Sequence, residues 1–240
     1  GEGRDLALLI ATDRYLEFPA LANPIRDAET LKRLLEERFG FEVTLLQNPT
    51  RAEVFAALEA LRRLPTHPRD QLFIHIAGHG LYDPVLRDGA IVLRHSKATD
   101  ADNRTRLLTR EFLHLVDTLP QRHVLVSLDV CFGGSIADAL SWDRPTFRGG
   151  GNDLGDRDLL DRLLARRSRF VLTSTESEPA PDGAPGDLSP FAAKWIEFLG
   201  GPGMRTHAQA VAAFQRLRTR PYSGEFGSHE SGGGFAFVPR

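Results

Sequence analysis

The stretch QLFIHIAGHG, residues 71–80, carries the most information about the fold. It reads as a buried strand that ends directly at a reactive side chain. Gln71–Ala77 is mostly apolar, which is typical of a strand covered on both faces of its sheet. Gly78, His79 and Gly80 follow at once, and the two glycines leave space around the imidazole. The stretch therefore predicts a central strand that ends at a candidate functional site.

A second apolar strand leads to a second reactive side chain. His123–Leu128 (HVLVSL) runs into Asp129 and then Cys131. Cys131 is the only cysteine in the sequence, which excludes an internal disulfide and a cysteine-cage metal site but permits a reactive thiol. Ligands of parallel α/β sheets bind beyond the carboxyl ends of the strands. We therefore expect His79 and Cys131 to meet at that edge of one sheet.

Strand-like and helix-like segments alternate along the rest of the chain. Apolar runs predict further strands at Leu6–Thr12, Phe41–Leu46, Phe170–Thr173 and Gly234–Val238, and a hairpin arm at Ala90–Leu93. Apolar residues at helical spacing predict helices at Arg26–Phe39, after a capping box of Thr50 and Glu53, at Thr109–Leu119 with Thr109 as cap, at Leu159–Ala165, after Ser189, and at Thr206–Arg218. This alternation predicts an α/β fold with a mostly parallel central sheet of about six strands and helices on both faces.

Composition excludes several classes of protein. At about 150 residues per domain, a length of 240 residues predicts one large domain or two small ones. The hydrophobic content of 41% is enough for a sizeable core and excludes a disordered polymer. The 30 Lys and Arg residues against 32 Asp and Glu residues leave a net charge of −2, so we expect neither nucleic acid nor an anionic membrane as a partner.

The beginning of the sequence carries no sign of export or membrane insertion. The first apolar run is too short to span a bilayer, and no signal-peptide pattern precedes it. The sequence starts at Gly1 instead of Met, so we interpret it as a processed form or a fragment of a longer protein. The cytoplasm, which is reducing, is the expected compartment.

A thiol beside an imidazole can act as a nucleophile with its own base. The backbone N–H groups of Gly80 and Cys131 can then point together at a developing oxyanion. Each residue alone is more commonly structural, as a buried cysteine or a turn histidine, but their shared placement favours chemistry. His75 alternates with Phe73 and Ala77, and we interpret it as a core histidine with satisfied hydrogen bonds.

The order and spacing of these residues carry a family resemblance. The histidine comes first and the cysteine 52 residues later, close to the spacing of about 50 in caspases. The chain resembles the caspase-like cysteine peptidases, in particular their bacterial, metacaspase-type (orthocaspase) branch. The segments that carry the resemblance are Asn23–Ala28, Ala77–Gly80, Asp129–Ser135, Phe170–Ser174, Ser189–Phe191 and Gly234–Pro239.

The resemblance implies a caspase-like three-layer sandwich that forms a single peptidase domain over residues 1–240. It would have a large portion of about 1–141, a flexible linker of about 142–157, rich in Gly, Pro and charge, and a small portion of about 158–240. It also implies a catalytic dyad in a cysteine endopeptidase. Cys131 is then the nucleophile that forms a thioester acyl-enzyme, and His79 is the general acid and base.

The resemblance further implies the specificity of the enzyme. The sequence lacks the Gln-Ala-Cys motif of true caspases, whereas Asp129 and Asp27 match the aspartates that line an acidic pocket in metacaspases. Charge-assisted hydrogen bonds would hold a guanidinium there, so we expect cleavage after Arg or Lys. Alternatively, Asp27 caps its helix and Asp129 accepts from a loop amide. Glu176 and Glu178 are weaker candidates for the pocket.

Two further properties are open at this point. Arg148 lies in the linker and is a candidate site of self-cleavage, although a solvated loop explains the segment equally well. Some metacaspases need calcium, and an acidic cluster is present at Asp138, Asp153, Asp156, Asp158 and Asp161. These spacings are not those of an EF-hand, and such carboxylates usually form a solvated helix face. We therefore expect no cofactor and no metal site.

The expected partners are a protein substrate and a regulatory domain or activating partner outside this sequence. A catalytically silent caspase-like interaction module is the main alternative, although such a module has no need of both His79 and Cys131. Another thiol-dependent amidase or acyl transferase on an α/β sheet is a third possibility. A nucleotide-binding fold is weaker, because no GxGxxG motif is present.

Overall fold

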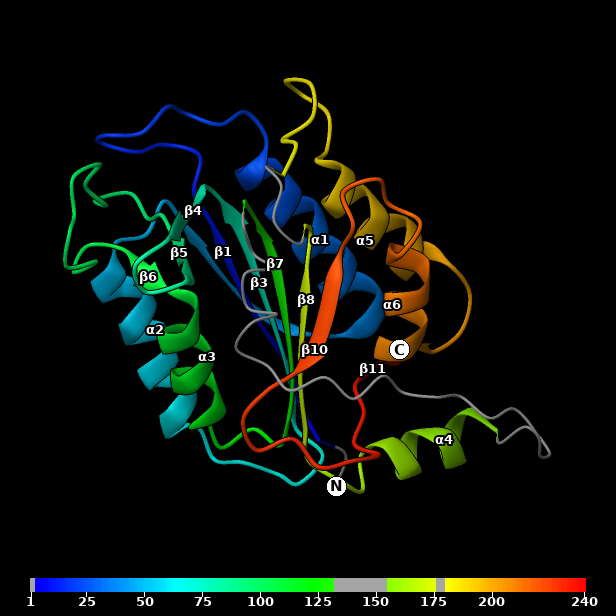
Figure 1. Cartoon of the computed structure of the whole chain (residues 1–240). Coiled ribbons are helices and arrows are strands. Elements are labelled where there is room, and N and C mark those ends of the chain that lie inside the picture. The colour runs from blue at the N-terminus through cyan, green and yellow to red at the C-terminus, as the bar shows by residue number, and fades with distance from the viewer. Residues whose placement is uncertain (1–2, 132–154, 176–179) are drawn as a thin grey trace.

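The computed structural model describes residues 3–131, 155–175 and 180–240 (Figure 1). Its central sheet has six strands in the order β10-β8-β7-β3-β1-β2. Their bounds are Asp5–Ala11 (β1), Glu42–Gln47 (β2), Gln71–Gly78 (β3), His123–Val130 (β7), Ser168–Thr173 (β8) and Tyr222–Glu225 (β10). The first five are parallel to one another, and β10 is antiparallel to β8 at one edge. The predicted sheet is therefore confirmed.

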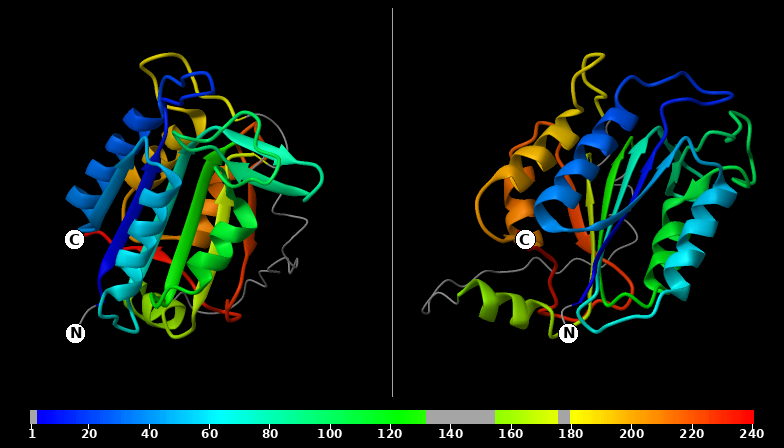
Figure 2. Two further views of the ribbon diagram at one scale, coloured as in Figure 1. Left: turned by 90° about the vertical axis from the view of Figure 1, so that its left-hand side faces the viewer. Right: turned by 180° about the vertical axis from the view of Figure 1, so that it is seen from behind.

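Helices cover both faces of this sheet (Figures 1 and 2). One face carries α1 (Pro24–Phe39), α5 (Pro190–Gly200) and α6 (His207–Phe214). The other face carries α2 (Arg51–Arg63) and α3 (Thr109–Asp117). Helix α4 (Asp156–Leu163) lies near the amino ends of the strands, away from both layers (Figure 1). Two small antiparallel sheets complete the described structure: β4 (Gly80–Asp83) with β5 (Asp88–Ile91) and β6 (Leu107–Leu108), and β9 (Arg205–Thr206) with β11 (Ala236–Phe237).

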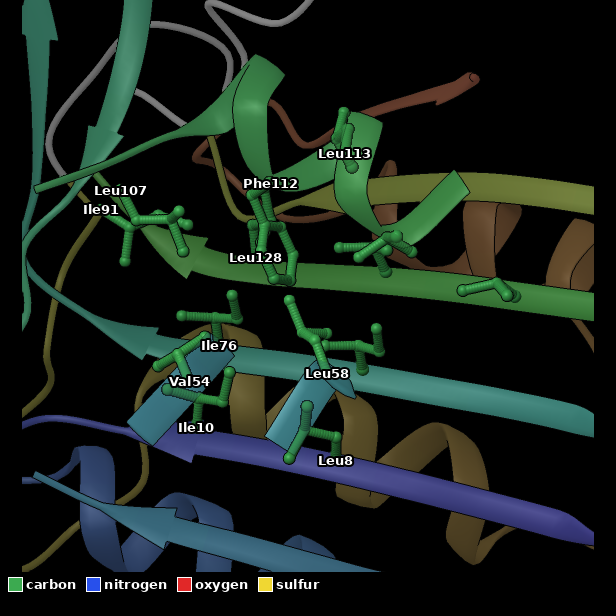
Figure 3. Packing of buried hydrophobic residues seen from close by; sticks show 14 of the residues in the cluster. Leu8, Ile10, Val54, Leu58, Ile76, Ile91, Leu107, Phe112, Leu113 and Leu128 are labelled. Atoms are coloured by element: carbon green, nitrogen blue, oxygen red, sulfur yellow. The ribbon is translucent and has the colours of Figure 1, made fainter. Parts of the chain in front are cut away.

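Side chains alternate along the strands, so each strand contributes to two separate hydrophobic cores. In β1, Leu8 and Ile10 face the α2 and α3 layer, where they pack with Leu58 and Phe112 (Figure 3). Leu9, one residue between them, faces the other layer, where α1, α5 and α6 supply large apolar side chains. Because both faces are covered, the strands are apolar almost throughout, which explains why short runs were enough to predict them.

Capping explains where several helices begin. The predicted capping box of Thr50 and Glu53 is present at α2, and the Ser189 side chain caps α5 by accepting from the Ala192 N–H. The prediction for α3 was wrong: Leu108 occupies the cap position, and the Thr109 hydroxyl donates to the Gly89 carbonyl at 2.9 Å. The hydroxyl of Thr109 therefore ties the helix to β5 instead of capping it.

One other sequence prediction needs correction, one strand was not predicted, and one prediction falls mostly outside the described residues. The last strand, β11, has two residues and pairs with β9, outside the central sheet. The sixth strand of that sheet is β10, which the sequence did not suggest. The predicted linker at 142–157 lies mostly outside the described residues, and its last two residues begin α4.

His75 is buried in the core as predicted, but its hydrogen bonds are only half satisfied. Its Nδ1 lies 3.0 Å from the Ser127 hydroxyl, which also accepts from the Trp195 indole at 2.8 Å. Its Nε2 has no partner in the described part of the chain. Burial lowers the pKa of His75 to about 4, so the ring is neutral at ordinary pH. This histidine belongs to the packing between β3, β7 and α5.

No helix within residues 3–131, 155–175 and 180–240 combines the length and the apolar character needed to cross a membrane.

Candidate active site

The parallel pairing of β3 with β7 brings the histidine and the cysteine to the same edge. Gly78 is in register with Val130, so His79 and Cys131 are the next residues on neighbouring strands. Both side chains line one pocket beyond the carboxyl ends of these strands. The other residues of its wall include Leu21, Pro24, Asp27, Asp129, Ala180, Asp182 and Ser189. Both residues therefore lie at one edge of the sheet and line the same pocket, as expected.

The segment between β1 and α1 holds His79 in place. The Nε2 atom lies 2.8 Å from the Pro19 carbonyl oxygen. Because a carbonyl only accepts, Nε2 carries the proton in this contact, and the neutral ring keeps Nδ1 as its basic nitrogen. The Pro19 backbone is a contact of the imidazole that the sequence did not reveal.

The chain around Cys131 is packed tightly. The thiol is partly exposed, and its sulfur accepts from the Ala180 N–H at 3.4 Å. A Cβ atom on Gly80 would lie 2.1 Å from the Cys131 carbonyl oxygen, so only glycine permits this approach of β4. The backbone of Gly80 is therefore adjacent to that of Cys131, as an oxyanion hole built from both residues requires.

Ser189 joins the two aspartates that the sequence assigned to the pocket. Its N–H donates to both carboxylate oxygens of Asp27, at 3.2 and 3.3 Å. Its hydroxyl donates to Asp129 at 2.6 Å. Asp27 thus does not cap α1, where Asn23 is the cap residue, and Asp129 binds a hydroxyl instead of a loop amide. The alternatives considered from the sequence, helix capping for Asp27 and a loop amide for Asp129, are therefore wrong. Both carboxylates instead contact Ser189 at the start of α5.

The two carboxyls are buried, with exposed fractions of 2% for Asp27 and 7% for Asp129. Burial is the main cause that raises the pKa of Asp27 to about 7, and the nearby Asp129 and Asp182 add to it. Burial also raises the pKa of Asp129 to about 6, again with a contribution from Asp182. A cation placed between these carboxyls would relieve this cost, so the pocket suits a positively charged group.

Comparison with known proteins identifies the family. The family model of the caspase domain matches residues 4–211. The chain belongs to the caspase domain family. The family is one of peptidases, and this membership supports the class of cysteine endopeptidase for the chain.

Two curated relatives and one solved structure extend this finding. Metacaspase-1 from two strains of Cryptococcus neoformans var. neoformans serotype D, JEC21 and B-3501A, is 35% identical over 95 residues. That match covers 35% of this chain and 21% or 20% of the relatives, so it spans about a fifth of their length. The crystal structure of caspase-1 from Spodoptera frugiperda superposes with a TM-score of 0.62 at 14% identity, over 92% of this chain and 86% of that one. It shows that this caspase domain has the caspase fold.

Asp182 is a pocket residue of this caspase domain that the sequence did not reveal. It lies in the loop before α5, and its carboxylate accepts from the Ala22 N–H at 2.7 Å. The Asn23 side chain fixes the loop by donating to the carbonyls of Asp182 and Ala184, at 2.6 and 2.9 Å. The only sequence signal was the position of this loop after a central strand, at the edge where ligands bind.

The remaining candidates are not placed in the pocket. Glu176, Glu178 and the self-cleavage candidate Arg148 lie outside the described residues, as do Asp138 and Asp153 of the acidic cluster. Asp156, Asp158 and Asp161 lie on α4, which has no buried residue. Within the described part of the chain, no three His, Cys, Asp or Glu side chains are arranged to hold a metal ion.

Proposed function

We propose that this caspase domain is a cysteine endopeptidase that cleaves proteins after Arg or Lys, with Cys131 as nucleophile and His79 as general acid and base. The observation that carries the proposal is the pocket itself, which places an imidazole and a thiol beside two buried carboxyls. Within the described residues, the groups that hydrogen-bond those carboxyls are neutral. A substrate cation would therefore be the missing counter-charge.

The chemistry follows from the state of the imidazole. With Nε2–H held by Pro19, Nδ1 is free to take the proton of the Cys131 thiol. The thiolate attacks the scissile carbonyl, and the N–H groups of Gly80 and Cys131 stabilise the oxyanion. His79 then returns the proton to the leaving amine, which leaves a thioester on Cys131. Water activated by the same imidazole hydrolyses the thioester and restores the enzyme.

Charge explains the selectivity for a basic residue. A guanidinium or ammonium that enters the pocket faces Asp27 and Asp129 where little water screens the attraction. Binding lowers the raised pKa values of both carboxyls, so they lose any proton they carry. An Asp side chain would instead bring a third negative charge to the pair. Cleavage after Asp, as in true caspases, is therefore disfavoured.

The same proposal extends to the organisation of the protein. We place residues 1–240 in one peptidase domain, with a large portion of about 1–141, a linker at 142–157, a small portion of about 158–240, and self-cleavage after Arg148. A free thiol nucleophile needs reducing surroundings, which favours the cytoplasm. The partners are a protein substrate and a regulatory partner. No cofactor is needed, and loss of activity on calcium chelation would contradict this.

Incubation tests self-cleavage after Arg148. Wild type should yield two fragments, and Cys131→Ala should stay intact. An Arg148→Gln protein that is still cut at the same bond would contradict the assignment of the cleavage site.

The decisive experiment compares short peptide reporters that end in Arg, Lys or Asp. Wild type should hydrolyse the Arg and Lys reporters at least about 100-fold faster than the Asp reporter. Cys131→Ala and His79→Ala should reduce hydrolysis to background, with unchanged unfolding temperatures as evidence of folding. Preference for Asp would refute the pocket assignment, and activity in Cys131→Ala would refute the mechanism.

A further inference from the structure

The segment between β1 and α1 contacts the histidine through Pro19 and through both the hydroxyl and the ring of Tyr15. The Pro19 carbonyl takes the Nε2 proton, as described above. The Tyr15 hydroxyl accepts from the His79 backbone N–H at 2.9 Å. The Tyr15 ring packs against the imidazole with 4.8 Å between the ring centroids and 43° between the planes. Figure 1 shows this segment, in blue, above the carboxyl ends of the strands.

Tyr15 uses both functions of its hydroxyl. It donates to the Thr12 carbonyl at 2.7 Å while it accepts from His79. Burial raises the pKa of Tyr15, so the hydroxyl keeps its proton and remains a donor in the neutral range. The hydroxyl therefore links the end of β1 to the end of β3 at the residue that bears the imidazole. Phenylalanine at this position would keep the ring contact and lose the link.

The backbone at the end of β3 is shaped to receive this hydroxyl. Gly78 has a φ of +154°, and a Cβ atom there would lie 2.8 Å from the Tyr15 oxygen. Phe18 adds a second ring, whose centroid lies 6.2 Å from that of Tyr15 and 6.3 Å from the imidazole. Contacts with the backbone, the ring face and Nε2 together limit rotation of the imidazole.

We propose that Tyr15 is a positioning residue for His79: its hydroxyl fixes the backbone that carries the imidazole, and its ring holds the plane of the imidazole. The inference rests on the proposed function, because it assigns a supporting role to the same histidine. Tyr15 acts through His79, so its loss should reduce the rate of the chemical step and leave the binding of the basic side chain by Asp27 and Asp129 largely intact.

The test uses the fact that Cys131 is the only cysteine of the chain. Alkylation by iodoacetamide therefore reports on this thiol alone, even if no peptide is cleaved. Measured over a range of pH, the alkylation rate of wild type should exceed that of His79→Ala, because the imidazole assists ionisation of the thiol. Tyr15→Phe should give an intermediate pH profile. Asp102→Asn, at an exposed residue that does not line the pocket, is the control and should follow wild type.

Reporter hydrolysis gives the second readout. Tyr15→Phe should lower kcat about tenfold and change KM less than about twofold, because orientation is lost and binding is not. Phe18→Leu should act in the same direction with a smaller effect, and it decides the matter if Tyr15→Phe does not fold. A wild-type alkylation profile in the folded Tyr15→Phe protein, or in Phe18→Leu where that variant must decide, would overturn the inference.

These readouts separate the two proposals. Wild type that cleaves no reporter but shows a Cys131 reactivity that depends on His79 would contradict the proposed function. It would still support the positioning role if Tyr15→Phe weakens that reactivity. Wild type that is alkylated like His79→Ala would overturn both.

Discussion

The two ends of the central sheet bury charge in opposite ways. At the amino ends of the strands, Arg169 is fully buried and its guanidinium lies 3.2 Å from Asp117. It also donates to the carbonyls of Arg122 and Leu119, at 3.0 and 3.1 Å. At the carboxyl ends, Asp27 and Asp129 share Ser189, a neutral residue, as their partner. One end is paired within the fold, and the other holds carboxyls to which no side chain of the described residues brings a cation.

The pKa values express this difference. Burial tends to raise the pKa of Asp117, but hydrogen bonds from Ser228 and the charge of Arg169 hold it below its ordinary value. At Asp27 and Asp129, burial outweighs the hydrogen bonds from Ser189, and the pKa values rise to about 7 and about 6. Burial of an unpaired charge costs free energy that a structural role does not require. The contrast therefore separates a stabilising ion pair from two buried carboxyls, to which the proposed function assigns a substrate cation.

Arg169→Met should have the largest effect, because it removes the cation of the paired end. It leaves several backbone carbonyls without a donor, and we expect a loss of about 4 kcal/mol in the free energy of unfolding, measured in urea. Arg104→Met, at an exposed ion pair with Asp102, is the matched control and should change stability by less than about 0.5 kcal/mol. A loss below about 1 kcal/mol for Arg169→Met would contradict the assigned role of the pair.

Asp129→Asn tests the unpaired end through activity. The amide can still accept from the Ser189 hydroxyl, so the fold should persist while the charge is lost. We expect kcat/KM for an Arg reporter to fall about 100-fold, or about 3 kcal/mol of transition-state binding. Asp102→Asn, the same change at an exposed position, should leave kcat/KM unchanged. An Asp129→Asn enzyme that cleaves after Arg as well as wild type would argue against the acidic pocket.

The pH dependence of stability should also distinguish the ends. Because folding raises the pKa values of Asp27 and Asp129, the folded state binds protons more tightly than the unfolded state. Their contribution is therefore most favourable below about pH 4 and is lost as the pH rises through about 7. The contribution of Asp117 has the opposite sign and is lost as the pH falls below about 4.

The measurement is the free energy of unfolding in urea at a series of pH values, for wild type and for the Asp27→Asn, Asp129→Asn double variant. The double variant should gain stability relative to wild type as the pH rises from about 4 to about 8. If the difference between the two proteins does not change with pH, the two carboxyls are not destabilised by burial.

Arg4→Met should give the smallest effect at the paired end. The Arg4 side chain lies 3.2 Å from Asp70, which is fully buried, but it is itself one-third exposed. Asp70 would keep the backbone N–H groups of Arg4 and His67, at 2.7 and 2.9 Å. A loss of about 1 kcal/mol in urea unfolding is expected. A loss as large as that of Arg169→Met would mean that exposure does not weaken this pair.

Much of the fold could be predicted because the central strands are covered on both faces. Runs such as Leu6–Thr12 and His123–Leu128 are apolar enough to be recognised without an alternating pattern. The edge strand β10 gave no such signal, since Tyr222–Glu225 is short, contains a glycine and buries only Tyr222 fully. Its place is set by pairing with β8, which is a tertiary interaction.

Strand positions alone predicted part of the candidate site, whereas Asp27, on α1, was assigned through the family resemblance. His79, Cys131 and Asp129 follow from the ends of β3 and β7, where position along the chain fixes position in space. Pro19 and Tyr15 come from an irregular segment and act partly through backbone atoms, so residue type carried little information about them. Asp182 reaches the pocket because Asn23 anchors its loop, a contact between residues far apart in sequence.

Gly80 shows how a residue without a side chain can be as constrained as the thiol beside it. A Cβ atom there would collide with the Cys131 carbonyl oxygen at 2.1 Å, and even alanine would push β4 away from the chain after β7. A saturation-mutagenesis screen scored on activity should therefore rank this glycine among the least tolerant positions. Its intolerance would come from the lack of space between two backbones. A smaller side chain at a neighbouring position would therefore not rescue an alanine at position 80.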